Sequence, residues 1–231
     1  MTSKASTIGL LGKNGRMGSV VQNLIKQQSD RFFLTDDLLN ADAVIDFSSP
    51  ECVKEFIEDV NTSKNARAPI LIVGSTPWKN ETLNILEKYL SKNLVFQAAN
   101  FSAGVFFLTQ ILEKYSKKIE TAGFVVSMEE QHHIHKKDAP SGTAVRLQKA
   151  IRPADPSSIP TKSIREGETI GVHDVFFEKS LEKLSFSHHA KDRSLFAQGA
   201  LDVSHWLCKN KEKLFKKNKI LHMEDWLLEN N

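Results

Sequence analysis

The stretch HHIHKKDAPSGT, residues 132–143, places three histidines and two lysines in six consecutive positions and follows them with an aspartate and a proline. Imidazoles titrate near neutral pH, and a lysine removed from water can have its pKa lowered toward that range, so both can donate protons. Ser141-Gly142-Thr143 predicts the start of a helix whose N–H groups can bind a carboxylate. The segment therefore favours an anion pocket with acid catalysis, suited to a small polycarboxylate.

The same segment has other interpretations. A zinc site would need a further ligand at tetrahedral spacing, and the ammonium groups beside it would repel the ion, so we expect no metal site. We do not expect Ser141 to act as a nucleophile, because the G-x-S-x-G turn that exposes such a serine is absent around it. A solvated basic loop stays open as an alternative, because runs of charge usually face water. Arg193, in HHAKDR, offers a guanidinium either to another carboxylate or to a surface ion pair.

A second candidate site is the segment GKNGRMG, in which Gly12, Gly15 and Gly18 lie between an apolar strand pattern and a helical pattern. Glycines there let backbone N–H groups approach a pyrophosphate, and the helix N-terminus adds partial positive charge. The surrounding strand and helix units are the context typical of a dinucleotide site, and a glycine turn without a ligand is the alternative. A phosphate loop of the NTPase type is excluded, because G-x-x-x-x-G-K-[ST] is absent.

Asp36 lies about 20 residues beyond these glycines, where dinucleotide domains place the carboxylate that binds the ribose 2′-OH. A helix N-cap or a solvated loop position is the alternative for this residue. A carboxylate favours NADH, whereas Lys13, Arg16 or Arg31 could accept the 2′-phosphate of NADPH. The sequence leaves the preference between the two cofactors open.

Apolar periodicity predicts the elements that position these groups. Strands over 7–11, 32–34, 43–47, 70–74 and 94–98 alternate with helical patterns, which predicts an α/β fold with an open parallel sheet. Beyond residue 100 we expect a helix over 104–119, a strand over 123–130, a short helix over 143–150, a loop over 152–163, strands over 172–178 and 183–188, and a helix over 194–207. These predict a Rossmann-like nucleotide-binding domain over 1–100, completed by the tail 208–231, and an α+β substrate and oligomerisation domain with a mixed sheet over 101–207.

Composition excludes several classes of protein. A net charge of +3 is too slight to imply a nucleic-acid partner, and the six lysines of 209–219 predict a solvated helix face or tail. Cys52 and Cys208 have no partner at metal or C-x-x-C spacing, which fits a reducing cytoplasm. No apolar stretch approaches the ~18 residues of a membrane span, and the first residues lack the apolar core of a signal peptide, so we expect no membrane partner.

Several motifs together resemble the 4-hydroxy-tetrahydrodipicolinate reductase family, whose members are also called dihydrodipicolinate reductases. EEQHHIHKKDAPSGTA, residues 129–144, follows the family signature almost letter for letter. HHAKDRSLFAQGALDVSHWL, residues 188–207, resembles the closing strand and helix of the family. Four shorter segments match in the same order, namely GKNGRMG (12–18), VIDFSSP (44–50), GST (74–76) and the hinge stretch AANFSAGV (98–105).

The resemblance implies roles for individual residues. His132 and Lys136 match proton donors, while His133, Gly142 and Thr143 match positions that hold the dicarboxylate substrate. The matched positions for nicotinamide-cofactor contacts are Gly12, Lys13, Asn14, Gly15, Arg16, Met17, Gly74, Ser75, Thr76, Ala98, Ala99, Asn100 and Phe101. His135 and Lys137 receive no specific role.

The resemblance also implies a reaction and an assembly. In this family a hydride passes from NADH or NADPH to C4 of 4-hydroxy-tetrahydrodipicolinate with loss of water, which yields tetrahydrodipicolinate on the diaminopimelate route to lysine. Family members are commonly homotetramers built through the sheet of the substrate domain. Two alternatives are a related dehydrogenase acting on another small dicarboxylate and a cofactor-binding regulator without turnover, although His132 and Lys136 argue against the regulator.

The chain departs from the family pattern at one turn. Ser75 replaces the usual threonine, and Pro77 stands where glycine is common, so we expect the backbone of that cofactor-side turn to differ. The region of the second strand is also short, which leaves open the residue that reads the adenine ribose.

Overall fold

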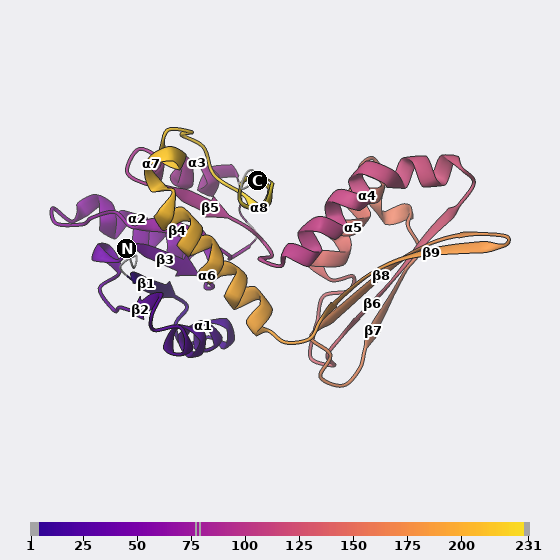
Figure 1. Ribbon diagram of the computed structural model, residues 1–231, viewed down its shortest axis with the longest axis horizontal. Coiled ribbons are helices and arrows are strands. Elements are labelled where there is room, and N and C mark those ends of the chain that lie inside the picture. Colours follow the sequence, from indigo (N-terminus) through magenta and orange to yellow (C-terminus); the bar gives the residue numbers. More distant parts are fainter. Residues whose placement is uncertain (1–4, 77, 79, 229–231) are drawn as a thin grey trace. The chain divides into compact units, whose positions relative to one another are not determined.

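The computed structural model describes residues 5–76, 78 and 80–228. Contacts divide the chain into two units, the first consisting of Met1–Phe101 with Ser194–Asn231 and the second of Ser102–Arg193 (Figure 1). The boundary after Phe101 lies inside the predicted hinge stretch. Pro77, one of the two expected departures from the family pattern, lies outside the described residues. None of the described helices combines the length and the apolar character that crossing a membrane requires.

The first unit is built on a five-stranded parallel sheet, which confirms the predicted doubly wound architecture. Its strands are β1 (Ser6–Leu11), β2 (Phe32–Leu34), β3 (Ala43–Asp46), β4 (Ile70–Val73) and β5 (Val95–Gln97), in the order β2-β1-β3-β4-β5. Every residue of β3 and β4 is buried. Continuous apolar runs such as ILIV form these strands because both faces of a parallel sheet are covered by helices.

Helices cover this sheet on both faces. They are α1 (Arg16–Gln27), α2 (Pro50–Thr62), α3 (Asn80–Tyr89) and α6 (Ser194–Lys209), with the short α7 (Lys211–Phe215), α8 (Met223–Leu227) and the 3₁₀ turn η1 (Leu38–Asn40). Val53 and Phe56 of α2 join Leu71 and Val73 of β4 in one apolar cluster. Ile72 points the other way from β4, because side chains alternate along a strand, and α6 packs against β3, β4 and α1.

The predicted domain boundary at 207/208 is wrong, because α6 belongs to the first unit. Its buried residues, among them Leu201 and Leu207, pack toward the parallel sheet. A Cβ added at Gly199 would collide with the backbone carbonyl of Phe101, so the helix lies directly against the end of the segment that follows β5. An amphipathic pattern shows that a helix has an apolar face, and the choice of sheet under that face is made by long-range packing.

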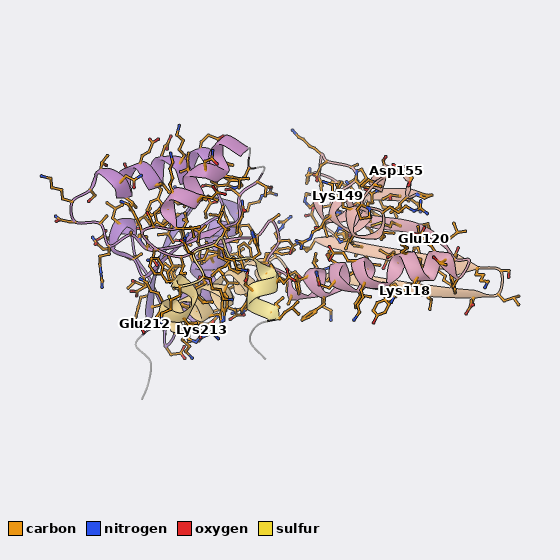
Figure 2. The ribbon with its side chains drawn as sticks, turned by 90° about the horizontal axis from the view of Figure 1, so that it is seen from above. Lys118, Glu120, Lys149, Asp155, Glu212 and Lys213 are labelled. Atoms are coloured by element: carbon orange, nitrogen blue, oxygen red, sulfur yellow. The ribbon has the colours of Figure 1, made fainter. Side chains whose placement is uncertain are left out.

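The end of the chain also returns to this sheet. Phe96 of β5 forms a parallel bridge with Leu221, and Gln97 N–H donates to the Leu221 carbonyl at 2.8 Å. In the lysine-rich run 209–219, Lys219 lies 2.6 Å from the buried carboxylate of Asp225. Part of this run therefore forms an ion pair, while Lys213 on α7, labelled in Figure 2, is exposed as predicted.

The second unit contains the predicted mixed sheet. Its strands are β6 (Val125–His132), β7 (Thr161–Arg165), β8 (Gly171–Lys179) and β9 (Glu182–Ala190), in the order β7-β6-β8-β9, with only β6 and β7 parallel. Strand β7 begins inside the segment 152–163, for which we predicted a loop. Three prolines lie in this segment, and a short edge strand paired on one side carries little periodic signal. The 3₁₀ turn η2 (Pro156–Ser158) precedes it.

Two helices pack on one face of this sheet, α4 (Ala103–Thr121) and α5 (Gly142–Ile151). Leu112 of α4 and Leu147 of α5 share an apolar cluster with Val126, Val175 and Phe177 of the strands. Glu120 is labelled near the end of α4 in Figure 2. It accepts a hydrogen bond at 3.0 Å from Nε of Arg152, the residue that follows α5. The helices are therefore joined to each other as well as to the sheet.

The packing of α1 on the glycine turn generates a stability prediction. A Cβ at Gly18 would lie 2.6 Å from the Lys13 carbonyl oxygen and closer still to that of Gly12, so Gly18→Ala must displace the turn. We expect the variant to lower the free energy of unfolding by about 1–3 kcal/mol, despite the higher helix propensity of alanine. Urea unfolding measures the change. Ser19→Ala, at the next and exposed position, is the control and should stay within about 0.5 kcal/mol of the parent.

Candidate functional site

The turn after β1 is shaped by glycine. Gly12 has a φ of +80°, which L-residues rarely adopt, and its Cβ would come 2.8 Å from the Phe47 carbonyl. Gly15 is the N-cap of α1 and contributes no side-chain cap, and the first turn of α1 contains no acidic residue. Backbone N–H groups at this end are thus open to an anion, and the partial positive charge of the helix favours one. The turn fits a dinucleotide pyrophosphate.

This turn lies at the reversal of the strand order. β1 is paired with β2 on one side and with β3 on the other, so the chain changes direction across the sheet between β1 and β3. Ligands of doubly wound folds bind outside the carboxyl ends of the strands at such a point. The contact of Gly12 with Phe47, directly after β3, places the glycine turn there.

A buried carboxylate organises the neighbouring turns. Asp46, the last residue of β3, has no exposed surface. One of its oxygens accepts from the Ser48 N–H at 2.8 Å, and the other accepts from the Ser75 N–H at 3.1 Å and from the Ser75 hydroxyl. Ser75, the expected departure from threonine, therefore engages Asp46 through both its backbone N–H and its hydroxyl. Sequence reasoning missed this role of Asp46, although a charge ending the apolar run AVID was a usable signal.

The predicted ribose-binding residue lies at the same edge of the sheet. Asp36 follows the end of β2 and is exposed, and its Oδ1 lies 2.5 Å from Lys13 Nζ. The N-cap of the following 3₁₀ turn is Asp37, so Asp36 does not cap it. One corner therefore offers a carboxylate suited to a ribose hydroxyl and an ammonium suited to a 2′-phosphate.

The other predicted cofactor residues follow β4 and β5. Gly74 lies against the backbone of Asp46, while Thr76 is exposed. In the segment 98–101, Ala98 and Phe101 are buried, and the Phe101 ring lies 5.7 Å from that of Phe47 and 6.2 Å from that of Phe96, centroid to centroid. Because carboxyl ends of parallel strands share an edge, the structure brings all four predicted cofactor segments to one side of the first unit.

In the second unit, the end of β6 carries a buried acid and a buried imidazole. Glu130 and His132 are two residues apart, so they point to the same face of the sheet. His132 Nδ1 lies 2.5 Å from Glu130 Oε2, and Glu130 Oε1 accepts from Arg165 Nη2 at 2.7 Å. Glu130 is 0% exposed and His132 is 7% exposed. The parallel register, which pairs His132 with Arg165, builds this chain of three groups.

The three groups set one another's charge. Burial acts to raise the pKa of Glu130, but hydrogen bonds from Arg165, Ser163 and His132 outweigh it and hold that pKa below its ordinary value. Burial lowers the pKa of His132, assisted by Lys136 and Arg165 and opposed by Glu130. An ionised carboxylate only accepts hydrogen bonds, so Nδ1 carries the proton of the neutral imidazole. Nε2 is then the nitrogen that can exchange a proton.

The surroundings of Nε2 include a residue that sequence reasoning missed. A Cβ at Gly171, the first residue of β8, would lie 3.0 Å from His132 Nε2. Glycine therefore places no side-chain atom against that nitrogen. Glu130 was also missed, yet it was detectable as a charge at a core-facing position of a strand whose other inward residues include Val126 and Met128. Arg165 carried no usable signal, because its strand was not predicted.

The loop after β6 holds Lys136 near this acid and imidazole. Lys136 Nζ lies 2.7 Å from Asp138 Oδ1, and Arg165 Nη2 donates to the Asp138 carbonyl at 2.6 Å. The hydrogen bond from Lys136 lowers the pKa of Asp138, against the opposing effect of burial. His133 is partly buried, whereas His135 and Lys137 are exposed. The interpretation as a solvated loop thus fits His135 and Lys137 and does not fit His132.

The helix predicted after this loop begins where expected. Ser141 is the N-cap of α5, and its hydroxyl accepts from the Ala144 N–H at 3.1 Å and lies 3.0 Å from His173 Nε2. Gly142 is exposed, with open space where a Cβ would lie, and Thr143 is partly buried. Ser141 is 2% exposed and occupied as a cap, which argues against a nucleophilic role. Arg193 is partly buried, and its binding of a carboxylate stays a prediction.

Three ligand-type side chains lie close enough together to raise the question of a metal. Ligand atoms of Glu130, His132 and His173 lie within 4.8 Å of one another, and all three residues are buried. Both oxygens of Glu130 are already engaged, one by His132 and one by the Arg165 guanidinium. A metal ion here would have to displace one of these hydrogen bonds from the carboxylate, so the contacts present are those of a hydrogen-bonded network.

Comparison with known proteins finds relatives along nearly the whole chain. Family models described as dihydrodipicolinate reductase, N-terminus and C-terminus, match residues 31–101 and 104–227. The 4-hydroxy-tetrahydrodipicolinate reductase of Bdellovibrio bacteriovorus is 33% identical over 94% of this chain and 97% of its own. The protein of the same name from Campylobacter jejuni is 30% identical over 93% and 98%. The solved dipicolinate-bound dihydrodipicolinate reductase from Paenisporosarcina sp. TG-14 shares the fold, with a TM-score of 0.71, 18% identity and coverage of 96% and 99%.

The buried histidines generate a pH prediction. Burial lowers the pKa of His173 to about 4, with neighbouring His132 adding to the effect, and burial likewise lowers the pKa values of His132 and His188. In the unfolded chain these imidazoles regain their ordinary pKa, so between about pH 6.5 and pH 4 the unfolded state binds more protons. Stability should therefore fall as the pH falls through this window, and His173 alone accounts for up to about 3 kcal/mol.

Urea unfolding at several pH values, compared between the parent and His173→Gln, isolates the contribution of this residue, because shifted carboxylates act equally in both proteins. The variant should show a shallower dependence on pH. Equal slopes would show that His173 does not titrate as its burial requires.

Proposed function

Because the chain belongs to the dihydrodipicolinate reductase family, we propose that it reduces 4-hydroxy-tetrahydrodipicolinate to tetrahydrodipicolinate with NADH or NADPH, on the diaminopimelate route to lysine. The observation that carries the proposal is the buried Glu130–His132 pair, in which His132 Nε2 faces Gly171. The His132 ring contacts that of His173, and His173 in turn contacts Ser141 at the N-terminus of α5. These groups can bind a small dicarboxylate and move a proton, as the reaction requires.

The residues of the first unit would hold the cofactor. The glycine turn 12–17 receives the pyrophosphate, and the segments 74–76 and 98–101 line the same edge of the sheet. When bound, the nicotinamide supplies a hydride to ring C4 of the substrate. Asp36 and Lys13 offer a partner to a 2′-hydroxyl and to a 2′-phosphate respectively, so we propose that the protein uses both cofactors.

The residues of the second unit would handle the protons. The net reaction consumes one hydride and one proton, and the C4 hydroxyl oxygen leaves as water. His132 can take a proton on Nε2 and return it, because the charge of Glu130 stabilises the imidazolium that forms. Lys136 gives one hydrogen bond to Asp138 and has further N–H donors for the substrate. His133, Gly142 and Thr143 hold the carboxylates, assisted by the positive end of α5.

We extend the proposal to assembly and location. Support for a homotetramer formed through the second unit comes from its sheet. Both described helices of that unit share an apolar cluster with the strands on one face, so the opposite face is available for contact with other copies of the chain. Sedimentation that finds only monomers would exclude it.

The two cysteines are free in the described structure, which fits the reducing cytoplasm. Export of the intact protein in a fractionated cell would contradict that location.

A coupled assay tests the function directly. We expect the product of dihydrodipicolinate synthase to support oxidation of reduced cofactor when NADH and NADPH are assayed side by side. Strong oxidation with another small dicarboxylate, and none with this substrate, would favour the related dehydrogenase instead. Cofactor binding without turnover on any dicarboxylate would favour the regulator.

His132→Gln tests the proton chemistry. Loss of the titrating nitrogen should lower kcat by about 10²–10⁴, the usual range for general acid–base catalysis, while the Kd for NADH stays close to that of the parent. Steady-state kinetics and cofactor fluorescence titration provide the two measurements. His135→Gln, an exposed histidine in the same segment, is the matched control and should retain kcat. Full activity of His132→Gln would refute the assignment.

A further inference from the structure

A row of polar side chains crosses the sheet of the second unit from edge to edge. The registers pair Ser163 with Glu130, Glu130 with His173, and His173 with His188, so β7, β6, β8 and β9 each contribute one residue. Side chains in one row of a sheet point to the same face. Here that face is the one packed against α4 and α5, where apolar residues would be expected.

His173 occupies the centre of this row. It is 4% exposed, and its ring lies 5.1 Å from the ring of His132, centroid to centroid and nearly perpendicular. Its Nε2 lies 3.0 Å from the Ser141 hydroxyl. Its Nδ1 is buried without a hydrogen-bond partner among the described residues. A buried unpartnered nitrogen costs free energy, so an apolar side chain would serve stability better at this position.

The helix contact of His173 is repeated once in the same row. Ser102 caps α4 by accepting from the Val105 N–H, and its hydroxyl lies 3.1 Å from His188 Nε2. Each of the two helices on this sheet therefore begins at a serine that contacts a histidine of the row. Only His173 also touches the imidazole of His132, which makes His188 a natural control.

We propose that His173 is a positioning residue for the reaction, which holds the N-terminus of α5 through Ser141 at a fixed place relative to His132. The inference rests on the proposed function, since it assigns α5 to a substrate carboxylate and His132 to proton transfer. His173 Nε2 is engaged with the Ser141 hydroxyl and its ring lies against that of His132, so it acts through these two neighbours. A carboxylate seated on α5 is thereby kept in register with the proton-exchanging Nε2.

Two variants of different reach test the proposal. The amide nitrogen of glutamine can take the place of histidine Nε2, whereas that of asparagine falls short of Ser141. We expect His173→Asn to weaken dipicolinate binding, measured by calorimetry, about tenfold and to lower kcat, while His173→Gln restores binding to within about threefold of the parent. The Kd for NADH should be unchanged in both. His188→Asn, which removes the same contact on α4, should leave dipicolinate binding within about threefold.

A further variant approaches the contact from the helix. Ser141→Gly keeps much of the capping stability but removes the hydroxyl, so it should match His173→Asn in dipicolinate affinity. The double variant Ser141→Gly/His173→Asn should lose no more dipicolinate affinity than the single variant that binds dipicolinate less tightly. This arm also covers the case in which His173→Asn does not fold.

The outcomes separate the two proposals. Equal dipicolinate binding by His173→Asn, His173→Gln and the parent, or additive losses in the double variant, would overturn the role of His173. A parallel loss of NADH binding would show a general structural defect and would overturn it too. A parent protein that neither binds dipicolinate nor turns over the substrate would overturn the proposed function itself.

Discussion

The candidate site of the second unit depends on one buried charge, the carboxylate of Glu130. An ionised carboxylate without exposed surface is stable only when its oxygens are hydrogen-bonded and its charge is balanced. Arg165 balances it at 2.7 Å, and His132 engages the other oxygen. This arrangement engages Nδ1 of His132 and leaves Nε2 as the nitrogen available for proton exchange. It also ties β7, through Arg165, to the loop that carries Lys136.

The first unit follows a different constraint, set by backbone geometry. A parallel sheet directs the carboxyl ends of its strands to one edge, so segments far apart in the chain become neighbours there. Glycine at positions 12 and 18 lets the turn and helix α1 come close to each other and to the end of β3. Asp46 then holds the turns after β3 and β4 with one carboxylate. Backbone groups can therefore approach a ligand with little side-chain obstruction.

Much of this organisation was predictable because its signals are local. Short apolar runs separated by helical patterns identify the strands of the first unit, and Ser141-Gly142-Thr143 identifies the start of α5 to within one residue. Strand β7 escaped prediction, because five residues at a sheet edge beside several prolines have no clear period. The unit to which α6 belongs escaped as well, since its apolar face suits either sheet. Glu130 was visible as an anomaly, but its partner was not.

The sequence by itself determined the residue types of the chemistry and their local frame: a histidine and lysine cluster before a helix N-terminus, and a glycine turn after a strand. Tertiary structure decided which of these groups are buried and hydrogen-bonded to one another. The pairing of Glu130 with Arg165 joins residues 35 positions apart, and it exists only through the register of β6 and β7. Burial and the distance to partners decide whether a histidine is a solvated side chain or a buried imidazole with a shifted pKa, and both are set only by folding.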